Sequence, residues 1–261
     1  MTRMLAGRNA LITGANAGLG LAIAKRLAAA GCNVMLNGLA PEDEVAADLA
    51  AMQEGGVRAR YRHADIADRA ALQALLQEAA DPGGIDILVN NAAIRHFGNV
   101  EDLTVEGWDL EFGVNLHSAF LAARFVLPGM RARNWGRIIN MASVYGLMGA
   151  AGRAGYVTTK HALVGLTRAI ALETVRTGIT CNALCPATVL TPQMEARLQA
   201  EMAKSGKPRP EAEEAFLSTR QPSRRFVDAD HVAAMALLLC GPEGESITGA
   251  TLPIDGAWSV S

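Results

Sequence analysis

Short apolar runs alternate with longer amphipathic segments along most of this chain. The apolar runs are too short for helices and too continuous for one-sided strands, which is typical of strands buried on both faces of a sheet. They predict strands at Asn9–Thr13, Asn33–Leu36, Arg58–Tyr61, Ile85–Val89, Arg137–Met141, Ile179–Leu184 and Thr251–Ile254. The amphipathic segments predict helices at Gly18–Ala30, Pro41–Met52, Arg69–Ala79, Val105–Met130, Tyr156–Thr177 and Asp228–Leu239. The alternation predicts an α/β fold of the Rossmann type: a doubly wound, seven-stranded parallel sheet with helices on both faces.

One segment interrupts this alternation. Thr191–Phe226 is charged and contains Pro208, Pro210 and Pro222, which punctuate helices. We interpret residues 191–226 as an insertion with one or two short helices. Met194–Met202 has helical spacing, and it is either a lid that closes over a substrate or a plain surface helix. The whole chain, residues 1–261, is expected to form a single domain, because half of it is hydrophobic and can bury one sizeable core.

The overall charge narrows the possible partners. The net charge is −2 and the isoelectric point is about 6.2. Since no basic run exists, we expect no nucleic-acid partner, and no apolar run reaches the ~20 residues that span a membrane. The four cysteines are scattered, and no His, Cys or Asp cluster has metal-ligand spacing, so no metal is expected. We expect a reduced, cytoplasmic protein, since the N-terminus lacks a signal-peptide pattern.

A glycine-rich turn joins the first predicted strand to the first predicted helix. Thr13–Gly20 has the spacing G-x-x-x-G-x-G, and glycines there allow a tight turn and close approach of the backbone to a pyrophosphate. A glycine-rich turn with no ligand is the alternative interpretation. The contacts expected for a dinucleotide cofactor are Gly14, Asn16, Ala17, Gly18, Leu19 and Gly20.

The end of the second strand bears on the choice of cofactor. A basic residue there would bind the 2′-phosphate of NADP. No Arg or Lys occurs between Arg26 and Arg58, and none occurs in Ala15–Ala17, so we expect NAD. Asp65 either contacts the adenine or caps the following helix, and Asn90 and Asn91 either line the cofactor crevice or form a turn. Further cofactor contacts are expected at Leu39, Asp65, Ile66, Asn91 and Ala92.

The candidate chemistry lies between Ser143 and Lys160. Tyr156 and Lys160 are four residues apart, so they share one helix face if a helix begins near Tyr156. A nearby ammonium lowers the pKa of a phenol from about 10 and makes it a usable general acid or base. Ser143 has a hydroxyl to donate to a carbonyl oxygen, so the set suits interconversion of a ketone and an alcohol. An ordinary helix face is the alternative interpretation.

Asn115 is predicted to lie in an apolar part of the helix Val105–Met130. A buried Asn needs hydrogen-bond partners. It either braces the helix or belongs to a proton path.

Together these motifs resemble the short-chain dehydrogenase/reductase family over essentially the whole chain. The matching features are Thr13–Gly20, Asp65, Asn90–Ala92, Asn115, Ser143, Tyr156, Lys160, Pro186 and Thr191–Pro192. The resemblance implies that Tyr156 is the general acid/base, that Lys160 lowers its pKa and binds the nicotinamide ribose, that Ser143 polarises the substrate carbonyl, and that Asn115 holds a water in a proton relay.

The resemblance also implies cofactor contacts and an assembly. Cofactor contacts are assigned to Tyr156, Lys160, Pro186, Val189 and Thr191. A homotetramer is implied, packed through the helices Val105–Met130 and Tyr156–Thr177. Two positions depart from the usual pattern, because Ala93 and Ala187 stand where the family commonly has glycine. We expect these to shift cofactor packing slightly and to leave the acid/base set intact.

Within that family the chain is similar to the bacterial D-3-hydroxybutyrate dehydrogenases, which oxidise a small 3-hydroxy acid with NAD. The similar segments include Leu36–Gly38, Ala162–Thr167, Ala171–Thr174 and Asp255–Trp258. Their Gln, His, Lys and second Gln that hold the substrate carboxylate correspond here to Arg95, Tyr145, Arg153 and Arg197. A pocket tryptophan corresponds to Thr188, which suggests a wider pocket, while Trp258 is retained.

Three arginines in place of one cation indicate an anionic substrate, since guanidinium groups bind carboxylates bidentately. The alternative is that they are solvated loop charges. The expected function is an NAD-dependent oxidoreductase that interconverts a small, 3-hydroxybutyrate-like hydroxy acid and its keto acid. The alternatives are a reductase of a bulkier keto substrate (a cyclic ketone, sugar acid or acyl thioester) and a non-catalytic nucleotide-binding regulator. The substrate contacts are assigned to Arg95, Ser143, Tyr145, Arg153, Tyr156, Thr188, Arg197 and Trp258.

Overall fold

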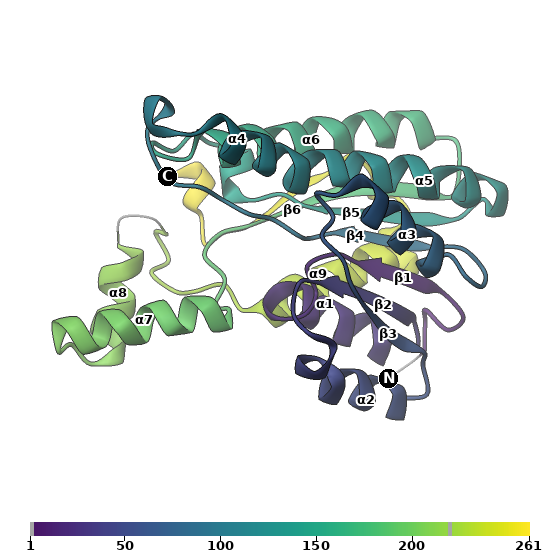
Figure 1. Ribbon diagram of the computed structural model, residues 1–261, viewed down its shortest axis with the longest axis horizontal. Helices are drawn as coiled ribbons and strands as arrows, with labels where there is room; N and C mark the ends of the chain where they lie inside the picture. The colour runs from purple at the N-terminus through teal and green to yellow at the C-terminus, as the bar shows by residue number, and fades with distance from the viewer. Residues whose placement is uncertain (1–2, 219–220) are drawn as a thin grey trace.

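The computed structural model describes residues 3–218 and 221–261. Their strands form a seven-stranded parallel sheet in the order β3-β2-β1-β4-β5-β6-β7 (Figure 1). The strands are β1 Asn9–Ile12, β2 Asn33–Gly38, β3 Ala59–His63, β4 Ile87–Asn90, β5 Gly136–Met141, β6 Ile179–Pro186 and β7 Thr251–Ile254. The strand order reverses direction between β1 and β4, where a doubly wound sheet opens a crevice at its carboxyl end. The predicted Rossmann-type α/β fold is therefore confirmed.

Helices cover both faces of the sheet (Figure 1). The helices are α1 Gly18–Ala29, α2 Ala46–Glu54, α3 Arg69–Ala79, α4 Val105–Phe112, α5 Ser118–Arg133, α6 Ala154–Thr174, α7 Pro192–Ser205, α8 Arg209–Leu217 and α9 Ala229–Cys240. One apolar core lies between the sheet and α1, α2 and α9, and a second lies between the sheet and α3, α5 and α6. Every residue of β4, β5 and β6 is buried, which explains their continuous apolar sequences.

The predicted helix Val105–Met130 is not one regular helix. A π-helical turn, Gly113–His117, separates α4 from α5, and α5 continues to Arg133. Such a turn inserts one extra residue, and π-turns occur often at functional sites. Periodicity did not predict it, because the surrounding residues remain apolar on either helical register. The turn carries Asn115.

Two other helices differ from the prediction by more than one residue at their ends. The segment predicted as Pro41–Met52 begins with a short 3-10 turn at Glu42–Glu44, and α2 itself runs from Ala46 to Glu54. The next difference matters for the chemistry, because α6 begins at Ala154 and ends at Thr174. Tyr156 therefore lies within the first turn of α6.

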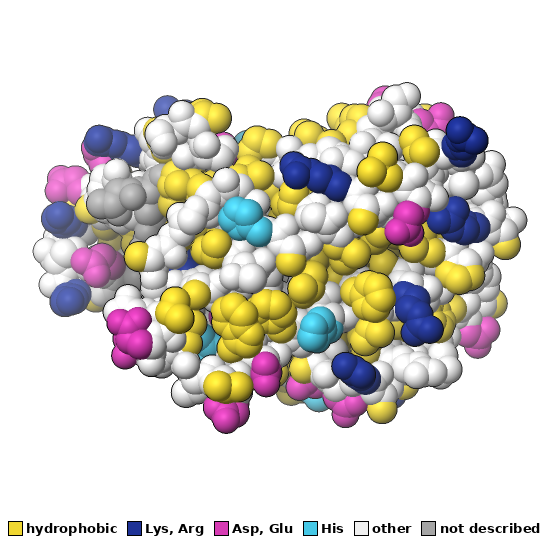
Figure 2. All heavy atoms as spheres, turned by 90° about the horizontal axis from the view of Figure 1, so that it is seen from above, with side chains coloured by type: hydrophobic (Ala, Val, Ile, Leu, Met, Phe, Trp, Pro, Cys, Tyr) yellow, Lys and Arg dark blue, Asp and Glu magenta, His cyan; other side chains and the backbone are white. Residues whose placement is uncertain are grey.

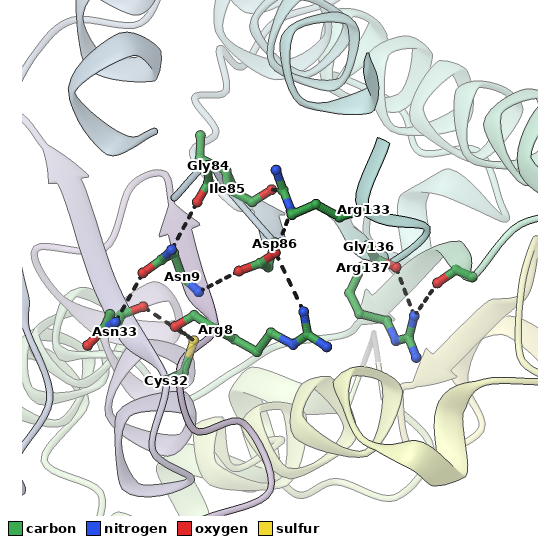
Figure 3. A network of polar contacts seen from close by, with 11 residues as sticks. Arg8, Asn9, Cys32, Asn33, Gly84, Ile85, Asp86, Arg133, Gly136 and Arg137 are labelled. Carbon is green, nitrogen blue, oxygen red and sulfur yellow. Dashed lines mark hydrogen bonds and ion pairs between the residues drawn. The ribbon is translucent and has the colours of Figure 1, made fainter. Parts of the chain in front are cut away.

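A buried carboxylate closes the amino-terminal end of the sheet. Asp86 accepts hydrogen bonds from the Asn9 backbone (3.0 Å) and from Arg133 Nε (3.1 Å), and Arg8 lies 3.7 Å away (Figure 3). These contacts join the starts of β1 and β4 to the end of α5. This network is at the opposite end of the strands from the crevice.

The segment 191–226 contains α7 and α8, in agreement with the prediction of one or two short helices. Figure 1 shows the pair projecting away from the sheet. Arg209 joins them, with hydrogen bonds to both oxygens of Glu195 (2.7 and 2.8 Å) and to Glu213 (2.7 Å). Leu198 of α7 and Leu217 of α8 are fully buried. In the described ranges, no helix combines the length and apolar character that a membrane span requires.

Candidate active site

A cleft of about 430 Å³ opens where the strand order reverses. The predicted cofactor residues that line it are Gly14, Asn16, Ala17, Gly18, Leu19, Gly20, Leu39, Asp65, Ile66, Asn91, Ala92 and Thr191. Ala93, Ile94, Val114 and Gln193 also line it and were not assigned from sequence. Four other predicted contacts, Tyr156, Lys160, Pro186 and Val189, lie outside the cleft lining, towards the ends of β5 and β6.

The glycine turn fits a pyrophosphate. Gly14 has a φ of +61°, and a Cβ there would lie 2.7 Å from Ala92 Cα. Asn91 Nδ2 fixes the turn by donating to the carbonyl oxygens of Thr13 (2.9 Å) and Gly14 (2.8 Å). The residue before α1, Ala17, provides no side-chain cap. The first N–H groups of α1 therefore face the cleft without a side-chain acceptor, which is the arrangement that binds phosphate at a helix N-terminus.

The end of the cleft beside β2 and β3 is uncharged except for Asp65. No Lys or Arg is among its described lining residues, and Leu39 lies there with 62% of its surface exposed. Asp65 accepts a hydrogen bond from Ala67 N (2.9 Å). It does not cap α3: Asp68 does so, by accepting from Ala70 N at 2.7 Å. Asp65 therefore lines the cleft and does not cap the helix, so the capping interpretation is wrong, and contact with the adenine stays a prediction.

Ser143, Tyr156 and Lys160 come together beyond the end of β5. Lys160 is buried, and its Nζ donates to Met141 O at 2.7 Å and lies 5.4 Å from the centre of the Tyr156 ring. Ser143 follows β5, and its Oγ accepts from Tyr145 N at 3.2 Å. The α6 start at Ala154 places Tyr156 and Lys160 on one helix face, one turn apart.

The charges that act on the phenol differ from those predicted. The pKa of Tyr156 lies above its ordinary value, because burial raises it by more than the charge of Arg95, a hydrogen bond with Ser143 and the charge of Arg153 lower it. The lowered pKa that we expected from Lys160 is therefore wrong for this structure, in which the net shift is upward. Burial instead lowers the pKa of Lys160 itself to about 8, because a buried ammonium is poorly solvated. The two arginines therefore contribute to the electrostatics of the phenol.

Asn115 braces the site from the π-helical turn. Its Oδ1 accepts from Ile94 N (2.8 Å), and its Nδ2 donates to Ile94 O (2.9 Å) and Thr159 Oγ1 (3.2 Å). These bonds connect the segment after β4 to α6, next to Lys160. Of the two interpretations made from sequence, bracing is the one that the hydrogen bonds demonstrate.

Most of the predicted substrate residues lie together beside Tyr156. The Arg153 guanidinium lies 5.0 Å from the centre of the Tyr145 ring. Tyr145 packs edge-on against Trp258, with ring centres 5.4 Å apart, and against Tyr156 at 6.4 Å. Arg153 and Arg95 both approach Phe97, at 4.8 Å and 6.0 Å from its ring centre.

Two predicted substrate residues are not joined to this group. Arg197 is exposed on α7, and within residues 3–218 and 221–261 it forms no hydrogen bond or ion pair. Thr188 lies after β6, where its backbone N–H donates to Gln221 Oε1 at 3.2 Å. Of the three predicted arginines, Arg95 and Arg153 are therefore the two near Tyr156, and the third, Arg197, belongs to the projecting helix pair.

Sequence reasoning missed three residues of this region. Phe97 stacks with both arginines, and a single aromatic residue in a loop gave no signal. The buried Glu111 contacts the partly exposed His96 behind the loop, with His96 Nδ1 3.4 Å from Glu111 Oε1. Glu111 did leave a signal, because it stands between Leu110 and Phe112 in a helix where a carboxylate is unusual inside. Across the described ranges, no group of three His, Cys, Asp or Glu side chains is arranged to hold a metal ion.

The chain is similar to known proteins over nearly its full length. The family model "short chain dehydrogenase" matches residues 8–202. A D-beta-hydroxybutyrate dehydrogenase from Cupriavidus necator is 43% identical over 98% of this chain and 99% of its own length. The crystal structure of levodione reductase superposes with a TM-score of 0.87 at 33% identity, over 98% of this chain and 99% of that one. A 3-oxoacyl (acyl-carrier-protein) reductase from Agrobacterium tumefaciens C58, with NADP bound, has a TM-score of 0.88 at 29% identity, over 97% and 95%.

The chain belongs to the short-chain dehydrogenase family. It is an oxidoreductase that acts on CH–OH groups, and the cofactor of its class is a nicotinamide nucleotide. This family membership argues against the alternative that the protein is a non-catalytic nucleotide-binding regulator.

Proposed function

We propose that this enzyme interconverts a small anionic hydroxy acid, similar to 3-hydroxybutyrate, and its keto acid with NAD. The observation that carries the proposal is the position of Tyr156. It lies between the buried Ser143 and Lys160 on one side and the two arginines, Arg95 and Arg153, whose charges act on its phenol. A general acid/base beside two arginines suits a substrate with both a reacting hydroxyl and a carboxylate.

The proposed chemistry uses four side chains, those of Tyr156, Ser143, Lys160 and Asn115. When bound, NAD supplies the group that accepts the hydride from the substrate carbon. Tyr156 Oη takes the proton from the substrate hydroxyl as the carbonyl forms, and Ser143 Oγ donates a hydrogen bond to that same oxygen. Lys160 holds the cofactor ribose and returns the proton towards solvent, along the side of α6 that Asn115 braces.

The proposal of NAD rather than NADP rests on the cleft lining. Its glycine turn fits the pyrophosphate, and Gly14, Gly18 and Gly20 leave room for close backbone contact. A 2′-phosphate carries a double negative charge and needs a basic partner. At the adenosine end it would face Leu39 and Asp65 instead. The NADP bound in the related reductase makes a direct comparison of both cofactors necessary.

Arg95 and Arg153 are proposed to hold the substrate carboxylate, with Tyr145 and Trp258 packing on its carbon chain. Arg197 would join them only if α7 moved towards the site. We propose that residues 191–226 form such a lid, since the α7–α8 pair projects from the sheet as a unit held by Arg209 (Figure 1).

A second candidate is a reductase of a bulkier keto substrate. It is supported by Thr188, which gives a smaller side chain at a pocket position, and by the similarity to levodione reductase. Incubating the enzyme with NAD or NADP and a panel of hydroxy acids and neutral secondary alcohols, while following the absorbance of reduced nicotinamide, separates the candidates. Turnover of hydroxy acids supports the first proposal, and turnover of neutral cyclic alcohols alone supports the second.

We also propose that the enzyme is a homotetramer. Figure 2 shows apolar side chains gathered on the face that carries α4, α5 and α6. The exposed apolar residues of these three helices are Val105, Trp108, Leu110, Phe120, Phe125 and Leu172. A cluster of large apolar side chains of this kind is typical of a protein interface. Sedimentation velocity tests the proposal, since a monomer at micromolar concentration would contradict it.

A further inference from the structure

The segment from Ile94 to Gly98 is fixed at alternate residues. Asn115 holds both backbone groups of Ile94. The backbone N–H of His96 donates to Glu111 Oε1. The backbone N–H of Gly98 donates to Gly152 O at 3.2 Å, and Gly98 pairs with Arg153 in an isolated bridge. The segment is thus bound to Asn115 at Ile94, to Glu111 at His96 and to Gly152 at Gly98.

The two intervening residues, Arg95 and Phe97, lie on the side of the segment towards Tyr156. The Arg95 guanidinium lies 6.0 Å from the Phe97 ring centre, and Arg153 lies 4.8 Å from the same ring. Arg153 in turn contacts Tyr145, whose ring packs against Tyr156 at 6.4 Å. A continuous series of ring and guanidinium contacts therefore leads from Arg95 to the phenol.

Glu111, which holds the middle of this segment through the His96 N–H, is unusual because a carboxylate is rarely buried. It is only 1% exposed, although it carries a carboxylate. Its Oε1 accepts the backbone N–H of His96 and lies 3.4 Å from His96 Nδ1, which forms no hydrogen bond within the described residues. Its other oxygen packs against Gly155, where a Cβ would collide with it. One carboxylate thus touches both the Arg95 segment and the residue before Tyr156.

Burying a carboxylate costs free energy that an apolar side chain of similar volume would avoid. An apolar residue at this position would fill the space but could not accept the His96 N–H. The acceptor is therefore what distinguishes Glu111 from an ordinary core residue of α4.

We propose that Glu111 is a positioning residue, whose buried carboxylate fixes residues 94–98 against the start of α6 so that Arg95 and Phe97 face the substrate beside Tyr156. The inference rests on the proposed anionic substrate. Without the anchor, the segment keeps its two ends but loses its centre, so the Arg95 guanidinium samples other positions. Substrate binding then weakens, while Tyr156, Ser143 and Lys160 remain in place.

The test compares Glu111→Gln and Glu111→Ala with Glu106→Gln, an exposed acid of the same helix. We expect Glu111→Ala to raise KM for the anionic substrate about tenfold, Glu111→Gln to raise it less, and both to change kcat less than about twofold. KM for a neutral secondary alcohol of the same carbon skeleton and the kinetics of Glu106→Gln should stay unchanged. An unaltered KM in folded Glu111→Ala, or an equal loss with both substrates, would overturn the proposal.

A second measurement keeps this inference separate from the proposed function. Hydrogen exchange of the peptide that contains residues 94–98 should be faster in Glu111→Ala than in wild type and Glu106→Gln. If the wild type oxidises no hydroxy acid, the proposed function fails, and exchange alone decides whether Glu111 holds the segment. Equal exchange in all three proteins would show that it does not.

Discussion

The ammonium group of Lys160 donates a 2.7 Å hydrogen bond to the carbonyl oxygen of Met141. Met141 ends β5 and Lys160 lies in α6, so this bond joins the strand to the helix that carries Tyr156. Both partners are buried, and burial lowers the pKa of Lys160 to about 8. The protein therefore holds a charge where a neutral side chain would be less costly, as functional sites often do.

The first prediction concerns how the free energy of unfolding depends on pH. Between about pH 8 and pH 10.5 the unfolded chain binds a proton at Lys160 that the folded chain does not. Stability rises with pH wherever the unfolded state binds more protons, so wild type should gain up to about 1.4 kcal/mol per pH unit relative to Lys160→Met. Below this window both states hold the proton and the difference is constant. Urea unfolding of both proteins at several pH values measures the difference in their free energies of unfolding. A difference that does not change with pH would contradict the lowered pKa of Lys160.

The second prediction concerns the bracing residue. Asn115→Ala removes three hydrogen bonds and leaves the N–H and C=O of Ile94 without their partner. We expect a loss of about 2 to 4 kcal/mol in the free energy of unfolding. Asn99→Ala, at an exposed position in the same region, should change it by less than about 0.5 kcal/mol. Denaturant unfolding compares the two, and similar values for both would show that Asn115 is not a brace.

The third prediction separates the arginines. Arg153→Ala should raise KM for an anionic substrate about 10- to 100-fold, because a charge-assisted hydrogen bond is lost. Arg197→Ala should change KM much less, since Arg197 is exposed on α7 and has no contact with the Arg153 group in the described residues. Steady-state kinetics with both variants test this. A larger effect from Arg197 than from Arg153 would contradict the assignment of the carboxylate to Arg95 and Arg153, and would assign it to the lid instead.

The fourth prediction concerns cofactor choice. Leu39 is exposed at the adenosine end of the cleft, so Leu39→Arg should place a cation near a 2′-phosphate and raise kcat/KM for NADP about tenfold or more. Leu238→Arg, at an exposed position on α9, is the matched control and should have no effect. Kinetics with both cofactors measure the change. A wild type that already prefers NADP would contradict the account of this end of the cleft.

The features that the sequence predicted depend on short spacings. Strand and helix alternation fixed the α/β class, and Gly14, Gly18 and Gly20 needed only their order along one turn. Tyr156 and Lys160 are one helical turn apart, so a prediction of helix was enough to bring them together.

The features that it missed depend on contacts between distant segments. The π-helical turn at Asn115 adds one residue inside an apolar pattern that fits either register. Phe97 and Arg153 meet through the bridge at Gly98, more than fifty residues apart in the chain, which no local pattern encodes. The burial of Lys160, which lowers its pKa, arises from packing of α6 on β5 and is likewise invisible in the spacing.

The most direct test of the account is Tyr156→Phe, which removes only the phenolic hydroxyl. With NAD and an anionic hydroxy acid, we predict that kcat falls about 10²- to 10⁴-fold, as expected when a general acid/base is lost, while NAD affinity changes little. Stopped-flow measurement of the first turnover places the loss in the chemical step. A Tyr156→Phe enzyme that oxidises the hydroxy acid at the wild-type rate would contradict the central claim that this phenol carries the proton.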